Sequence, residues 1–215
     1  MGSMTYSMDL SNITSSFLDA DDLNVAASIL YKAYHDDPLF KDIFQYEKEG
    51  YQARLRSAIR EEITTFYDAN QPIIGLYEDS RLLGVCCLIS PDAAFGAGRF
   101  WHWRLKMLLT AGYFGTKQMI IKEEKVREKI PARNYHMLSF IGVDPSHQDK
   151  GLGHLLMSAV LGEMMEDPAS EGIGVLVTLP KCMSFFKDGS FELVEEIFVN
   201  EIKGKVMFRP RESSI

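Results

Sequence analysis

Apolar residues recur every three or four positions in three long stretches of the chain. These stretches comprise residues 21–34, 51–67 and 152–166, and the second carries charged residues on its opposite face. This spacing is the period of an α-helix that buries one side. We therefore predict three helices, the first of which ends before Pro38 because proline does not continue a helix.

Shorter apolar runs predict strands. Residues 72–91 contain two such runs, joined through Asp79 and Ser80 and ended by Pro91, which is the pattern of a β-hairpin. The run at residues 174–179 is almost continuously apolar, as expected of a strand that is covered on both faces. A short helix or turn is predicted at residues 181–188. Further strands are predicted at residues 135–143, 192–199 and 203–211.

Residues 95–133 form a distinct segment between the hairpin and the next strand. The segment holds nine Lys or Arg against three Glu, although the chain is acidic overall. We interpret it as a helical insertion of one or two helices. Solvated amphipathic helices are the simplest interpretation; the alternatives are contact with a substrate, a phosphate or a membrane surface. In the substrate interpretation, Trp101, Trp103 or Tyr113 shapes the acceptor site.

The order of the predicted elements indicates one α/β domain over residues 4–215. Residues 1–3 resemble a cloning remnant ahead of a native start at Met4, and no secretory leader follows. No apolar run reaches about 18 residues, so the sequence predicts no transmembrane segment.

The composition limits the partners, the location and the metal content that we expect of this domain. The formal net charge of −7 at pH 7 argues against a nucleic-acid partner, because nucleic-acid binders carry a basic surface. Adjacent Cys86 and Cys87 would point to opposite faces of their strand, so the three cysteines predict no disulfide framework and a cytoplasmic location. No cluster of Cys and His has the spacing of a metal site, and we expect no metal.

One loop carries the strongest chemical signal. Its sequence, VDPSHQDKGLG at residues 143–153, leads directly into the third predicted helix. A helix N-terminus presents free N–H groups and a partial positive charge, and phosphate is the usual ligand of such a site. A tight turn that needs two glycines is the alternative. The loop lacks the third small residue of a dinucleotide fingerprint and the Gly-Lys-Ser/Thr of a Walker loop.

The loop resembles the Gln/Arg-x-x-Gly-x-Gly/Ala motif of the GNAT superfamily of acetyl-CoA-dependent N-acetyltransferases. The motif is preceded by a strand that closes on Val143-Asp144-Pro145, and an aromatic-rich segment at residues 184–191 follows the next strand. The resemblance is close over residues 135–191. The matching residues of the motif are Gln148, Asp149, Lys150, Gly151, Leu152 and Gly153.

The resemblance implies a fold and a way of binding acetyl-CoA. The implied fold is a mixed, mostly antiparallel central sheet with helices on both faces and one splayed pair of parallel strands. Pantetheine would pair with the backbone of residues 141–143, and the pyrophosphate would bind the amides of residues 150–154. The implied cofactor contacts are Ile141, Gly142, Val143, Gln148, Asp149, Lys150, Gly151, Leu152, Gly153, His154 and Phe186.

The implied reaction is transfer of an acetyl group to a primary amine of a small molecule or peptide, by direct attack in a ternary complex. We predict His136 as the catalytic base, because an unperturbed histidine has a pKa near 6.5; a purely structural histidine is the alternative. The family often has a tyrosine as thiolate acid where this chain has Phe186. A covalent route through Cys182 needs a lowered thiol pKa, so direct transfer is preferred.

Two other interpretations of the loop stay open. A catalytically silent acyl-CoA-binding module, which regulates or holds a partner, shares the glycine loop and fits the absent tyrosine. An unrelated nucleotide-binding α/β protein fits less well, because the loop matches neither of the two phosphate-loop motifs.

The Asp36-Asp37-Pro38 turn is a candidate contact for a cationic acceptor or a simple turn. A homodimer through the last strands or the insertion is compatible with the sequence.

Overall fold

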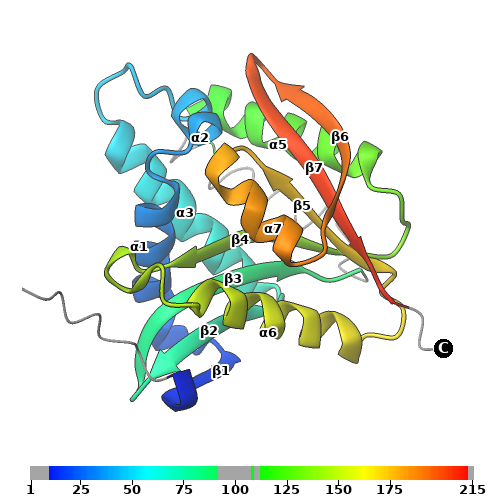
Figure 1. Cartoon of the computed structure of the whole chain (residues 1–215). Coiled ribbons are helices and arrows are strands. Elements are labelled where there is room, and N and C mark those ends of the chain that lie inside the picture. The colour runs from blue at the N-terminus through cyan, green and yellow to red at the C-terminus, as the bar shows by residue number, and fades with distance from the viewer. Residues whose placement is uncertain (1–9, 92–107, 109–111, 213–215) are drawn as a thin grey trace, which may run out of the picture.

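The computed structural model describes residues 10–91, 108 and 112–212. Within these residues, seven strands form one sheet in the order β1-β2-β3-β4-β5-β7-β6 (Figure 1). Neighbouring strands are antiparallel except β4 and β5, which run parallel. The strands are β1 (Ile13–Phe17), β2 (Ile73–Glu78), β3 (Arg81–Ile89), β4 (His136–Val143), β5 (Gly172–Val177), β6 (Glu192–Val199) and β7 (Ile202–Pro210).

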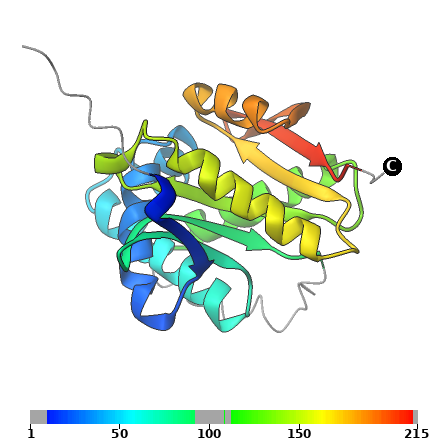
Figure 2. The same cartoon turned by 60° about the horizontal axis from the view of Figure 1, so that its bottom comes forward.

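Helices cover both faces of this sheet (Figures 1 and 2). The helices α1 (Leu23–Tyr34), α2 (Pro38–Ile43), α3 (Tyr51–Asp68) and α5 (Gly112–Lys129) enclose one core, and α6 (Leu152–Glu166) and α7 (Met183–Asp188) enclose the other. Buried Cys87 belongs to the first core and buried Cys86 to the second, and both thiols are free. The predicted mixed, mostly antiparallel sheet with helices on both faces is confirmed.

Pro38 begins a helix as well as following one. Oδ1 of Asp37 accepts hydrogen bonds from the amides of Leu39 (2.9 Å) and Phe40 (3.2 Å), so this side chain caps α2. Proline suits the first helical position, where its missing N–H leaves no hydrogen bond unmade. The sequence prediction treated Pro38 as the end of a helix only and therefore missed α2.

A β-bulge divides β4 into two halves. Cys87 and Leu88, which are neighbours in β3, pair with Phe140 and Leu138, so Ser139 has no partner on β3. The extra residue changes the face to which the following side chains point. Leu138 accordingly lies in the core beside α6, whereas Phe140 lies in the core beside α1.

β4 and β5 separate beyond this bulge. Their parallel pairing comprises three residue pairs, from His136 with Ile173 to Leu138 with Val175. Among the described residues, positions 139–143 of β4 have no strand partner on the β5 side. This is the splayed parallel pair that the sequence predicted, and it leaves backbone groups at that edge open to a ligand.

α5 lies within the predicted insertion at residues 95–133. Trp101 and Trp103 lie outside the described residues, and Tyr113 is 73% exposed. None of the described helices combines the length and the apolar character that a membrane-spanning helix requires. α5 instead contributes residues to the cavity that opens between β4 and β5.

Candidate functional site

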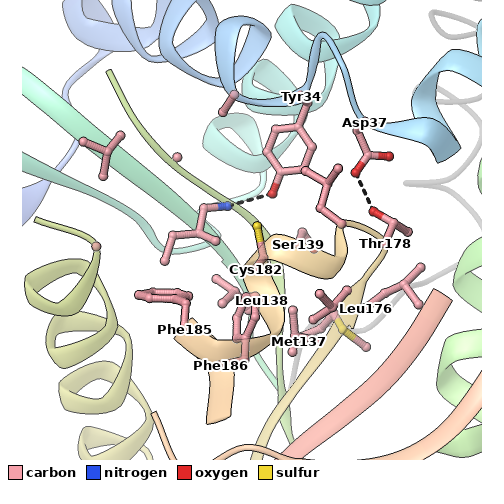
Figure 3. Close-up of a pocket in the computed structure, with 18 of the residues that line it drawn as sticks. Tyr34, Asp37, Met137, Leu138, Ser139, Leu176, Thr178, Cys182, Phe185 and Phe186 are labelled. Atoms are coloured by element: carbon pink, nitrogen blue, oxygen red, sulfur yellow. Dashed lines mark hydrogen bonds between the residues drawn. The ribbon is translucent and has the colours of Figure 1, made fainter. Parts of the chain in front are cut away.

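A cavity of about 800 Å³ lies where β4 and β5 separate (Figure 3). Both strands line it, together with the end of α1, the start of α2, part of α5, α7 and the loop that precedes α6. That loop follows the last residue of β4. Tyr135, which also lines the cavity, precedes the first residue of the same strand. The cavity therefore extends along the strand, from the glycine loop at one end to α5 at the other.

The glycine loop presents the start of α6 to the first end of the cavity. Gly151 adopts the left-handed conformation (φ 84°) and is the N-cap, so no side chain caps this helix. The carbonyl of Gly151 accepts hydrogen bonds from the amides of His154 (3.0 Å) and Leu155 (3.3 Å). The amides of Leu152 and Gly153, the first two residues of the helix, lie too early in it to have an acceptor inside the helix, and the helix dipole adds partial positive charge there. This end of the cavity suits an anion.

Gly153 allows the same helix start to approach α7 closely. A Cβ at this position would lie 3.1 Å from Cε2 of Phe185, which is tighter than an ordinary contact. The ring of Phe185 lies 5.4 Å from the ring of His154 and 5.1 Å from the ring of Phe186, measured between centroids. Because all three rings line the cavity, the glycine sets the spacing between the anion-binding end and its aromatic wall.

Two other polar residues of the loop are occupied within the protein. Nε2 of Gln148 donates to the carbonyl of Val143 (3.1 Å) and so ties the loop to the end of β4. Nζ of Lys150 donates to the carbonyl of Ser146 (3.3 Å), and Lys150 is exposed beside the cavity without lining it. The positive charge at this end therefore comes chiefly from the helix start, with Lys150 nearby.

Tyr34, the last residue of α1, reaches the open edge of β4. Its hydroxyl oxygen accepts a hydrogen bond from the amide of Ile141 (3.1 Å), two residues beyond the bulge (Figure 3). Edge-to-face contacts with Phe40 (5.3 Å) and Phe140 (5.4 Å) hold the ring. Burial raises the pKa of this phenol well above 10, so the hydroxyl stays protonated at neutral pH. Cys182 lies close by on the cavity wall.

Asp37 places a buried carboxylate in the same cavity. The residue is 3% exposed; Oδ1 caps α2 and Oδ2 accepts a short hydrogen bond from the hydroxyl of Thr178, just after β5 (Figure 3). Burial raises the pKa of Asp37 above that of an ordinary aspartate, against the opposing effects of Thr178, the capped amides and Lys122. A carboxylate tuned in this way can exchange a proton nearer to neutral pH.

The family model described as the acetyltransferase (GNAT) family matches residues 30–188, which is more than half of the chain. The chain belongs to this family. The matched range contains the glycine loop, the splayed strands, Tyr34 and Asp37. Members of the family use acetyl-CoA as co-substrate and act on amine acceptors.

Solved structures of GNAT acetyltransferases share the fold at low sequence identity. A histone acetyltransferase HPA2 and related acetyltransferase from Corynebacterium glutamicum aligns with a TM-score of 0.68 at 15% identity, covering 95% of this chain and 99% of its own. Agmatine N-acetyltransferase aligns with a TM-score of 0.61 at 13% identity, over 93% and 100% of the two chains. The ribosomal-protein-S18-alanine N-acetyltransferase from Escherichia coli aligns at 0.52 and 12%, over 94% and 96%. No curated protein matches the sequence significantly.

The end of the GNAT cavity that lies away from the glycine loop carries charges of both signs. Lys122, Glu123 and Arg127 of α5 line it, together with Arg133. Burial raises the pKa of Glu123, while the neighbouring Lys122 and Arg127 lower it. Among the described residues, no group of His, Cys, Asp and Glu is arranged to hold a metal ion. Acid–base chemistry at this end therefore has two carboxylates available, Asp37 and Glu123.

His136 does not reach the cavity of this GNAT protein. The residue is 1% exposed, and its Nδ1 lies 2.9 Å from Oγ of Ser170, whose hydroxyl also donates to the carbonyl of Gly172 (3.2 Å). This buried contact joins the first residue of β4 to the loop before β5. The geometry matches the structural alternative for His136 better than the role of a base.

The structure brings together most of the residues that the sequence singled out. Ten of the eleven predicted cofactor contacts line the cavity, and Lys150 is the exception. The sequence did not indicate Tyr34 or Thr178, and it left the role of Asp37 open. A signal existed only for Asp37, because an acidic residue before proline is typical of a helix N-cap.

Proposed function

We propose that this GNAT protein is an acetyl-CoA-dependent N-acetyltransferase that acetylates a primary amine of a small molecule or peptide. Transfer occurs by direct attack of the amine on the thioester in a ternary complex. One observation carries the proposal: a single cavity joins the uncapped start of α6, the open edge of β4 and the buried carboxylate of Asp37. The three features supply a phosphate site, a backbone edge and a proton acceptor.

The donor fits the first two features. The diphosphate of CoA suits the amides at the start of α6, where a helix dipole favours negative charge. The amide groups of pantetheine suit the unpaired edge of β4 at residues 141–143, because peptide groups next to such an edge form strand-like hydrogen bonds. Phe185 and Phe186 provide an apolar wall beside this path. The thioester then comes to lie near Ser139 and Tyr34, at the bulge.

The acceptor fits the remaining part of the cavity. A free alkylamine is protonated at neutral pH, since its pKa is near 10.4, and only the neutral amine attacks a thioester. The buried carboxylate of Asp37 attracts the ammonium form and takes its proton, directly or through one water molecule. The raised pKa of Asp37 makes it a stronger base than an ordinary aspartate. Glu123 is the second carboxylate within this end of the cavity.

A covalent acetyl-cysteine intermediate is disfavoured by the environment of Cys182. The thiol lines the cavity and is free. Burial raises its pKa, and Asp37 acts in the same direction, while Lys181 opposes them. The thiolate is the nucleophilic form of cysteine, so a raised pKa lowers its reactivity. Direct transfer needs no such nucleophile.

The catalytically silent module keeps one observation in its favour, since Phe186 has no proton to give to a leaving thiolate. Release of free thiol from acetyl-CoA, followed across a panel of amines, separates the two functions. Calorimetry with CoA is measured in parallel. CoA binding together with amine-dependent thiol release supports the enzyme, binding without release supports the module, and absence of binding refutes both. A cytoplasmic location and a homodimer stay predictions.

A further inference from the structure

The hydroxyl of Tyr34 makes only half of the hydrogen bonds that it can form. A phenol accepts hydrogen bonds and donates one. The oxygen of Tyr34 accepts from the amide of Ile141 at 3.1 Å, and among the described residues its hydrogen is donated to no partner. Polar groups inside proteins are normally paired, so a hydroxyl on the wall of a cavity with its hydrogen undonated points to a ligand acceptor. Figure 3 shows this hydroxyl beside Cys182.

We propose that Tyr34 donates a hydrogen bond to the thioester carbonyl oxygen and stabilises the negative charge that develops there during acetyl transfer. The inference rests on the proposed function of the cavity. It assigns a catalytic role to a residue of α1 in a chain that has Phe186 in the aromatic segment of α7. Phe186 packs against Phe185 and Phe191, so it contributes apolar contact but no hydrogen bond.

The proposed reaction has an addition step and an elimination step. The amine nitrogen forms a bond to the carbonyl carbon, and the π electrons of the carbonyl move to its oxygen, where Tyr34 donates its hydrogen bond. The carbonyl then re-forms, the carbon–sulfur bond breaks, and the thiolate leaves with the electron pair. Asp37 passes the proton of the incoming ammonium ion to water before the attack and then takes up the proton that the nitrogen loses after it. This second proton returns through water to the thiolate. Amine and thioester become amide and thiol.

The surroundings make the phenol a donor at this point. The bond from the Ile141 amide polarises the hydroxyl, since hydrogen bonds in a chain strengthen one another. Burial is the main cause that raises the pKa of Tyr34; the Ile141 amide opposes it, and Asp37 and the two cysteine thiols add to it. The phenol therefore keeps its proton and stabilises charge without being ionised. Phe40 and Phe140 hold the ring in place, so little reorganisation is needed when charge develops.

Other donors to the carbonyl are less well placed. The amide of Ile141 is already paired with Tyr34, and the hydroxyl of Thr178 is paired with Asp37. Ser139, the bulge residue, also lines the cavity and carries a hydroxyl. It is a competing hydroxyl donor at the bulge, and a Ser139→Ala variant tests it.

The test compares Tyr34→Phe with Tyr31→Phe. Tyr31 lies one turn earlier on α1, is 7% exposed, does not line the cavity and stacks on Arg56. Both substitutions remove one phenolic hydroxyl and retain the ring. We expect kcat to fall about 100-fold in Tyr34→Phe, as for loss of one oxyanion donor, and to stay within about twofold in Tyr31→Phe. The pH dependence of kcat, which we assign to Asp37, keeps its midpoint.

Calorimetry provides a readout that does not need turnover. In Tyr34→Phe, the Kd of acetyl-CoA rises about fivefold, as for loss of one neutral hydrogen bond, whereas the Kd of CoA, which lacks the carbonyl, changes by less than about twofold. The proposal is overturned if Tyr34→Phe keeps full kcat or if Ser139→Ala alone lowers it. It is also overturned if Tyr34→Phe weakens the binding of acetyl-CoA and of CoA equally. If the wild type acetylates no amine, the proposed function fails, and an unchanged ratio of the two Kd values then overturns the role of Tyr34 separately.

Discussion

Replacement of Asp37 by asparagine tests the proton acceptor with little disturbance of the fold. Asparagine and aspartate are equally good N-caps, so the Asn Oδ1 continues to accept from the amides of Leu39 and Phe40. Thr178, which now donates to Oδ2, can rotate its hydroxyl and accept from the new Nδ2. Only the buried negative charge is lost. We expect the free energy of unfolding at pH 7 to change by less than about 1 kcal/mol.

Activity responds much more strongly than stability in this variant. Loss of a positioned base typically lowers the rate by about 10²- to 10⁴-fold, so we expect kcat/KM of Asp37→Asn to fall by that factor. Affinity for CoA stays the same, because the glycine loop lies at the other end of the cavity. Asp37→Ala is a harsher variant: it also removes the cap, at about 1 kcal/mol, and leaves the hydroxyl of Thr178 without its partner.

Asp36→Asn is the matched control. Its side chain is 82% exposed, and it pairs with Lys41 at 2.9 Å on the surface. The substitution removes one negative charge from the neighbouring residue, so it reproduces the change in net charge without touching the cavity. We expect full activity and almost unchanged stability, since exposed ion pairs contribute little.

The pH dependence of stability gives an independent check on the same carboxylate. Burial raises the pKa of Asp37 in the folded protein above its unfolded value of about 3.9. The folded protein therefore holds this proton to higher pH than the unfolded chain, and the free energy of unfolding falls as pH rises between the two pKa values. Denaturant titrations of the wild type lose this increment with rising pH, whereas Asp37→Asn does not. The kcat/KM of the wild type rises over the same interval, because the base must be ionised.

Two results would refute the reasoning about Asp37. If Asp37→Asn keeps its kcat/KM within about twofold of the wild type, the carboxylate is an N-cap only, and Glu123 becomes the remaining carboxylate at that end of the cavity. If Asp36→Asn loses as much activity as Asp37→Asn, the effect arises from net charge rather than from the buried site. Thiol-release kinetics on the four proteins, with CoA affinity measured on the same preparations, decide between these outcomes.

Four further substitutions, one of them a control, probe the rest of the site and its surroundings. Gly151→Ala forces a side chain into the left-handed conformation (φ 84°), so we expect weaker CoA binding and a loss of about 1 kcal/mol of stability. Gly162→Ala is the control: it lies in open space on the same helix and should stabilise the protein by about 0.5–1 kcal/mol. Calorimetry measures the CoA affinity of both variants, and denaturation measures their stability. Cys182→Ala keeps kcat within about twofold, and an acetylated enzyme intermediate detected by mass spectrometry would contradict this. His136→Ala removes one of the two hydrogen-bond partners of the buried Ser170 hydroxyl and lowers stability by about 1–3 kcal/mol, while kcat of the protein that remains folded is retained.

Much of the fold could be predicted because the decisive signals are local. The helix at 152–166 and the strand at 192–199 match the structure residue for residue, since each is bounded by residues that stop it. β1 was missed because it is a short edge strand with two apolar residues, Ile13 and Phe17, and a mostly exposed surface. Its pairing with β2, about 60 residues later in the sequence, gives no local pattern.

The residues of the site likewise fall into those with a local sequence signal and those without one. The glycine loop is recognisable from the sequence because the residues that build it are consecutive. Tyr34 was not identified as a member of the site, and Asp37 was left open between an acceptor contact and a simple turn, because their partners are remote. Ile141 lies 107 residues after Tyr34, and Thr178 lies 141 residues after Asp37. We predicted His136 as the base from the pKa of histidine alone, but the structure buries this side chain against Ser170. Side-chain chemistry that depends on tertiary contact was therefore the part that sequence patterns could not supply.

The buried carboxylate also bears on the choice between an enzyme and a silent CoA-binding module. Burial of a charged group opposes folding unless hydrogen bonds offset it, and Asp37 needs Thr178 and two backbone amides to do so. An N-cap alone does not require the second carboxylate oxygen to face a cavity, since serine caps a helix equally well. CoA binding does not require it either, because the proposed phosphate site is the glycine loop. A proton acceptor for an incoming amine requires both the charge and the cavity. Asp37, the N-cap of α2, provides both three residues after Tyr34, which contacts the open edge of β4.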